Sequence, residues 1–183
     1  MSPHQAFALA MFFVSGGTTV ACEELYDAAA MGELERVLEL VSSTNDVAAC
    51  KDKWGFTPLH GVVTGHGSVT EDDLTIAQTL IDHGANVEAK TDTGATPLMI
   101  CPYPELIELL VDNGADLEAT DNSGATALLY YAGDSNGPAA LKRALALGAN
   151  PNHSDKRGRT ALQIAIARSE DDKVQILRQF GAK

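Results

Sequence analysis

The stretch WGFTPLHGVV, from Trp54 to Val63, decides the fold of this chain. Proline is favoured at the first position of a helix, where its missing N–H costs no hydrogen bond, and a preceding threonine can cap the exposed amides. Thr57 and Pro58 therefore predict a helix that begins at Pro58. The same pattern returns in TGATPLMIC from Thr93, SGATALLYYA from Ser123 and RGRTALQIAIA from Arg157.

A second marker recurs in step with the first. It reads HGANVEA, NGADLEA, LGANPNH and FGAK, and its glycines fall at 84, 114, 148 and 181, with spacings of 30, 34 and 33 residues. Glycine is the residue expected where a helix ends in a left-handed turn. Each period therefore contains two helices, and the polar segment that follows is too short for a third.

This pattern resembles the ankyrin repeat, whose unit is about 33 residues long with a T-P-L-H-x-A signature. Thr57-Pro58-Leu59-His60 is the best copy, and Ala127 and Ala161 replace the proline in the last two units. The resemblance implies an all-α solenoid of about five helix-turn-helix units, with β-hairpin fingers projecting from the stack. It also implies that His60 forms hydrogen bonds between neighbouring loops.

The two ends of the array differ from its middle. Residues 23–41, EELYDAAAMGELERVLELV, keep the helical pattern without the signature and carry acidic outer faces, as an N-terminal cap requires. Arg178 stands where inner repeats have an apolar residue, which suits a C-terminal cap. We expect units at 21–51, 52–90, 91–120, 121–154 and 155–183, preceded by an apolar tail or extra helix at 1–20.

Two neighbouring repeats depart from the period. The second is about six residues longer than the usual unit, and the excess falls in GHGSVTEDD, residues 65–73. The third is about three residues shorter, and its first helix is predicted to stop at Cys101, because Pro102 disfavours helical angles before it. Pro104 then begins the next helix. We expect Tyr130 or Tyr131 to fill the space left by the shortened helix.

The charge and the cysteines suggest a partner class and a compartment. Thirteen basic and 25 acidic residues give a net charge of −12, which argues against nucleic-acid binding and favours a protein partner with a basic surface. Cys22, Cys50 and Cys101 have no paired spacing, so the sequence predicts separate buried thiols in a reducing, cytoplasmic or nuclear setting. No apolar stretch is long enough to span a membrane.

The N-terminal run AFALAMFFV, residues 6–14, leaves an alternative open. It has the length of the apolar part of a signal peptide but lacks a preceding Lys or Arg. If this segment is cleaved, the chain is an exported or membrane-anchored protein that acts outside its own cell.

Motifs for catalysis, cofactors or metals are absent from the sequence. It contains no phosphate-binding glycine loop, HExxH, CxxC or calcium loop. Cys101 is the one candidate nucleophile, and a small structural side chain explains it better. We therefore expect a monomeric, non-enzymatic protein-interaction module without a cofactor.

In ankyrin arrays the fingers and first helices line a concave surface, where aromatic side chains often anchor a partner. The predicted partner-binding residues are Lys53, Trp54, Asp92, Thr93, Tyr103, Asn122, Ser123, Tyr130, Lys156 and Arg157.

Overall fold

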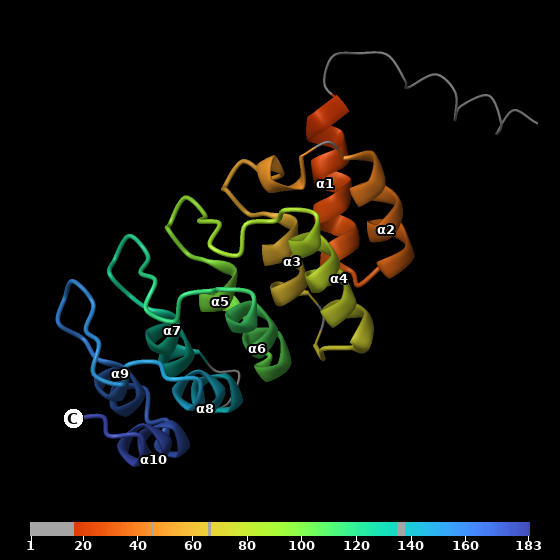
Figure 1. The fold of residues 1–183 in the computed structure, drawn as a ribbon. Coiled ribbons are helices and arrows are strands. Elements are labelled where there is room, and N and C mark those ends of the chain that lie inside the picture. Colours follow the sequence, from red (N-terminus) through yellow and green to blue (C-terminus); the bar gives the residue numbers. More distant parts are fainter. Residues whose placement is uncertain (1–16, 45, 66, 135–137) are drawn as a thin grey trace, which may run out of the picture.

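The computed structural model describes residues 17–44, 46–65, 67–134 and 138–183, and these form five pairs of helices in a curved stack (Figure 1). The apolar run at residues 6–14 lies outside the described part of the chain. The pairs are α1 (Gly17–Ala30) with α2 (Leu34–Ser43), α3 (Pro58–Thr64) with α4 (Glu71–Asp82), α5 (Pro97–Ile100) with α6 (Pro104–Asp112), α7 (Ala127–Gly133) with α8 (Ala139–Ala146), and α9 (Ala161–Ala167) with α10 (Asp171–Gln179). A short 3₁₀ helix, η1 (Val47–Ala49), follows α2.

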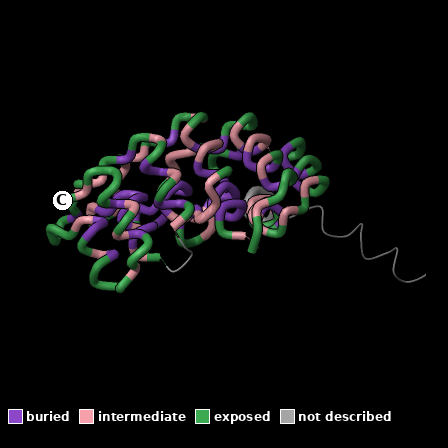
Figure 2. The backbone as a smooth tube through the Cα atoms, turned by 90° about the horizontal axis from the view of Figure 1, so that it is seen from below, coloured by how far each residue is buried: buried purple, intermediate pink, exposed green. Residues whose placement is uncertain are grey.

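The core runs along the stack between the layer of first helices and the layer of second helices. Leu59, Leu98 and Leu128 occupy the same signature position in successive repeats and are buried. Figure 2 shows the buried residues following the middle of the arc, with exposed residues at its loops. The repeat signature is therefore a packing signature, since each unit completes the core of its neighbour.

The fingers are tight hairpin turns joined to one another by backbone hydrogen bonds. Asp92 N–H donates to Trp54 O at 2.8 Å, Asn122 N–H to Thr93 O at 3.0 Å, and Lys156 N–H to Ser123 O at 3.0 Å. The described residues contain no β-strand in these fingers, only an isolated antiparallel bridge between Ser154 and Thr160. The predicted hairpins are thus present as turns, because their arms are too short to form a strand ladder.

The shortened helix of the third repeat is as predicted. Helix α5 has four residues, Cys101 ends it in extended backbone, and Pro104 begins α6. Tyr131 of α7 is buried, and its hydroxyl donates to Leu98 O. That carbonyl would normally accept from the residue four positions later, but Pro102 has no N–H. Of the two candidate tyrosines, Tyr131 therefore fills the space beside α5.

Among the first helices of the internal repeats, we expect amide hydrogen exchange to be fastest in residues 96–101. Helix α5 has only four residues, and its end is closed by a Cys101 N–H to Leu98 O hydrogen bond of 3.4 Å. Short helices open at low free-energy cost. Exchange measured by mass spectrometry on the native protein checks this, and equal protection of α3, α5, α7 and α9 would contradict it.

The prediction of three separate thiols was wrong. Cys22 of α1 and Cys50, just after η1, form a disulfide with their Cα atoms 5.0 Å apart. Twenty-eight positions separate them in the sequence, and the return of the chain after α2 brings them together. Cys101 is a free, buried cysteine, as expected.

The first and last helices each bury apolar residues against the stack. Arg178 of α10 is exposed, while Leu177 beside it is buried in the core. Helix α1 begins at Gly17 and carries Leu25, Ala28 and Ala29 on its buried side. No helix in the described part of the chain combines the length and the apolar character needed to cross a membrane.

Candidate functional site

The concave side of the last three repeats contains a groove with a volume of about 760 Å³. Side chains from the first helices α5, α7 and α9 line it together with two fingers. Its apolar part is formed by Met99, Ile100, Ala125, Leu129, Ile164 and Ala167. Its polar part is formed by Asp121, Ser123, Tyr130, Asp134, Asp155, Arg159, Gln163 and Arg168.

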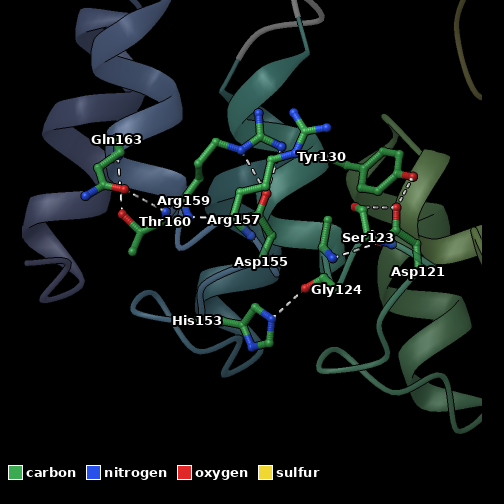
Figure 3. Close-up of polar contacts among 11 residues, drawn as sticks. Asp121, Ser123, Gly124, Tyr130, His153, Asp155, Arg157, Arg159, Thr160 and Gln163 are labelled. Atoms are coloured by element: carbon green, nitrogen blue, oxygen red, sulfur yellow. Dashed lines mark hydrogen bonds and ion pairs between the residues drawn. The ribbon is translucent and has the colours of Figure 1, made fainter.

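Asp121 organises the finger on one side of the groove (Figure 3). Its Oδ1 accepts from the N–H groups of Ser123 and Ala125, each at 2.8 Å, and its Oδ2 accepts from the Tyr130 hydroxyl at 2.9 Å. Burial alone would raise the pKa of Asp121, but these donors together lower it. Burial and the adjacent carboxylate raise the pKa of Tyr130 to about 12, so this hydroxyl is a hydrogen-bond donor.

Asp155 has the same role in the next finger (Figure 3). Its Oδ1 accepts from the N–H groups of Arg157 and Arg159 at 2.9 Å, and its Oδ2 accepts from Arg159 Nε at 2.8 Å. The N–H of Arg159 is the largest cause of the lowered pKa of Asp155. Asp121 and Asp155 are therefore held ionised and committed to their own fingers.

Sequence reasoning missed this aspartate turn, although a signal for it was visible. Asp52 also accepts from two backbone N–H groups, those of Trp54 and Phe56, at 2.8 Å. Asp52, Asp121 and Asp155 each precede a finger glycine by three residues, whereas the third repeat has Thr91 there. Thr91 Oγ1 accepts from Ala95 N–H at 3.1 Å in its place.

Eight of the ten predicted partner-binding residues lie exposed along the row of fingers. They are Lys53, Trp54, Asp92, Thr93, Asn122, Ser123, Lys156 and Arg157. The Lys53 ammonium lies 4.1 Å from the centre of the Trp54 ring. Two tip side chains bridge fingers: Asn122 Nδ2 donates to Asp92 O at 2.9 Å, and Lys156 Nζ to Asn122 O at 2.8 Å.

The two predicted tyrosines are in different places. Tyr130 lines the groove next to Ser123. Tyr103 is only partly exposed, in the turn between α5 and α6, and it packs against the core. The predicted partner-binding residues did not include Arg159, Gln163 and Arg168, which line the groove from repeat five.

His60 forms the inter-loop contact implied by the resemblance. Its Nδ1 accepts from Thr57 N–H at 3.1 Å, and its Nε2 donates to Ala95 O of the next repeat at 3.3 Å. His153 makes a similar contact between units, with Nε2 donating to Gly124 O at 2.9 Å. Burial lowers the pKa of His60, so the neutral ring is the form that fits this position.

We expect stability to fall as the pH drops below about 6.5, the ordinary pKa of histidine, because the unfolded chain then binds a proton that folded His60 resists. His60→Gln is the informative variant, since Gln163 occupies the same position in repeat five and accepts from Thr160 N–H at 3.1 Å. Urea unfolding at pH 7 and pH 5 should show a smaller pH effect in the variant. An unchanged pH effect would contradict this role for His60.

Burial keeps the one candidate nucleophile, Cys101, in its protonated form. Burial raises the pKa of the Cys101 thiol to about 12, and its Sγ lies 3.6 Å from Tyr103 O as a weak donor. A thiol that stays protonated is a poor nucleophile. Within the described ranges, no three His, Cys, Asp or Glu side chains are arranged to hold a metal ion.

Comparison with known proteins agrees with the geometry. A family model for ankyrin repeats, described as three copies, matches residues 25–121 and 101–183. The chain belongs to the ankyrin repeat family. Ankyrin repeats are in general protein–protein interaction units without enzymatic activity.

One curated relative shares part of the array. A 2-5A-dependent ribonuclease of Mus musculus is 38% identical over 76 residues, which is 42% of this chain and 10% of that protein. The chain therefore spans about a tenth of the relative's length. The similarity covers a segment, so the activity of the whole ribonuclease is not transferred by it.

Proposed function

We propose that this ankyrin protein is a non-catalytic, monomeric interaction module that binds a protein partner through its finger tips and concave first-helix face. The single observation that carries the proposal is continuity between two surfaces. Exposed tips follow one another from Trp54 to Arg157, and Ser123 belongs both to the tips and to the groove. A partner could therefore contact the tips and place a side chain in the groove at the same time.

Trp54→Ala combined with Asp92→Ala is expected to lower the affinity for a captured protein partner at least tenfold. Trp54 is 57% exposed and is the largest apolar side chain on the finger row. Buried aromatic anchors commonly supply about 2 kcal/mol or more to an interface. The partner is captured with the full chain, purified and titrated by calorimetry.

A matched control removes an aromatic and a carboxylate from another face. Phe180→Ala with Asp112→Ala changes exposed residues of the second-helix side. The control pair should leave affinity unchanged. Equal affinity of wild type and the Trp54/Asp92 pair would contradict binding through the fingers.

The disulfide supports a second candidate, an exported or membrane-anchored protein acting outside its own cell. Disulfides persist in oxidising compartments and are rare in the cytoplasm. The sequence alone favours the cytoplasm as the compartment. Cys22 and Cys50 are paired, and a secretory route would explain this pairing. Mass spectrometry of the mature protein decides between the two: an intact Met1 or Ser2 start with both thiols free favours the cytoplasm, whereas a cleaved start with the disulfide intact favours export.

A further inference from the structure

The acidic charge of the protein does not lie on its concave side. The fingers and first helices of repeats two to five, residues 51–64, 91–104, 121–134 and 155–168, carry six basic and five acidic side chains, a net charge of +1. The rest of the chain carries seven basic and 20 acidic side chains, a net charge of −13. The net charge of the whole protein is therefore a poor guide to the chemistry of a partner in the groove.

Asp121 and Asp155 are engaged within their own fingers, whereas two exposed arginines are not: Arg168, which lines the groove, and Arg157, at the tip of the Asp155 finger. Asp121 accepts from Ser123, Ala125 and Tyr130, and Asp155 pairs with Arg159 at 2.7 Å. Across the described residues, no hydrogen bond or ion pair holds the guanidinium groups of Arg157 and Arg168, and both residues are exposed. Arg168 thus offers an unpaired positive charge to a ligand in the groove, and Arg157 offers a second one on the finger beside it.

Asp134 is the remaining carboxylate at the edge of the groove. The ammonium of buried Lys173 donates to the backbone oxygen of Asp134, which brings a positive charge to the same residue. Asp134 has a further interaction besides this one. Asp134 is therefore not a free carboxylate opposite Arg168.

Arg168 lies beside an apolar space that Gly133 keeps open. A Cβ atom at Gly133 would stand 3.5 Å from Ile164 Cγ2 and 3.8 Å from Arg168 Nε. Ile100 and Leu129 continue this apolar lining. A guanidinium at the edge of an apolar groove pairs more strongly with a carboxylate than one in open water, because less solvent screens the pair.

We propose that this groove binds an acidic peptide segment of the protein partner, with one apolar side chain placed between α7 and α9 and its carboxylates paired with Arg168 and Arg157. The proposal rests on the proposed function and specifies the partner's chemistry. A peptide fits better than a nucleic acid, because phosphates gain nothing from the apolar lining and the −13 charge of the surrounding chain repels a longer polyanion.

The test uses the full-length protein and labelled peptide pools of about ten residues. In the first pool Leu or Phe is flanked by Asp and Glu, in the second Lys replaces the acids, and in the third Ala replaces the apolar residues. Fluorescence anisotropy at low and at physiological salt should show binding of the first pool. The second and third pools should bind at least tenfold more weakly.

Three variants test whether the peptide binds in the groove. Arg168→Gln keeps most of the side-chain length but removes its charge, and it should weaken the first pool at least tenfold. Gly133→Leu should block the apolar space without changing charge. Arg178→Gln removes an exposed arginine of α10 outside the groove and should have no effect. Thermal unfolding of each variant confirms that it folds.

Three results would overturn the proposal: equal binding of the acidic and basic pools, insensitivity of the acidic pool to both Arg168→Gln and Gly133→Leu, or tighter Arg168-dependent binding of a short single-stranded oligonucleotide. The captured partner separates the two levels of inference. One outcome is that its binding depends on Trp54 but is unaffected by Arg168→Gln and by competition with the acidic pool. In that case finger binding holds and the acidic-segment proposal fails. If it depends on neither residue, both fail.

Discussion

Replacing Tyr131 with alanine is expected to lower the free energy of unfolding by about 3–5 kcal/mol, as for other large aromatic truncations in a core. Tyr131 is 3% exposed and packs where α5 ends after four residues. Its loss would leave a cavity beside the shortest helix of the stack. It would also remove the hydroxyl that donates to Leu98 O, for which Pro102 has no N–H to offer. Chemical denaturation measured by circular dichroism gives the free energy directly.

Tyr131→Phe separates the hydroxyl from the ring. Leu98 O would keep only its 3.4 Å hydrogen bond from Cys101 N–H, and a lost hydrogen bond typically costs about 0.5–1.5 kcal/mol net, so this variant should lie between wild type and Tyr131→Ala. Tyr130→Phe is the matched control, because Tyr130 is half-buried and Asp121 retains its backbone donors. If Tyr131→Ala and Tyr130→Phe cost the same, Tyr131 does not support the shortened repeat.

Removal of the disulfide has the second largest expected effect. Cys22→Ser with Cys50→Ser should lower the free energy of unfolding by roughly 2–4 kcal/mol. Without the link, the unfolded chain regains the conformational entropy that closing the loop had removed. The link joins residues 28 positions apart and ties α1 to the base of the first finger. Loss of the link should loosen the N-terminal repeat before the others.

Denaturation with and without a reductant supplies the control for the disulfide. Wild-type protein should lose stability when the disulfide is reduced, and the double serine variant should not respond to the reductant. Hydrogen exchange should show faster opening of α1 in the variant and little change in α9. A variant as stable as the oxidised protein would contradict a stabilising role for the link.

The helices could be predicted because the residues at each boundary determine where the helix begins and ends. Thr57-Pro58 and Thr96-Pro97 mark helix starts, and Gly84 and Gly114 have positive φ angles of 91° and 92° at helix ends. The shortened repeat was predictable for the same reason, since Pro102 acts on its immediate neighbours.

Features that depend on pairing between distant residues were not predictable. Cys22 and Cys50 meet only after α2 has turned the chain back. The period could not decide between Tyr130 and Tyr131, because adjacent residues of one helix point to different sides. Arg168 was missed because repeat position alone does not tell which helix-end residues face the groove. The aspartate turns could have been predicted from the sequence, because each aspartate lies at the same distance before its finger glycine.

The finger-to-finger hydrogen bonds have an evolutionary consequence. They join backbone atoms, such as Asp92 N and Trp54 O, and the side chains of Trp54, Asp92 and Arg157 take no part in them. Side chains at Trp54, Asp92 or Arg157 can then be exchanged while the spacing of the row is kept. Selection could therefore change what the array recognises one tip at a time, without having to rebuild the protein that presents the tips.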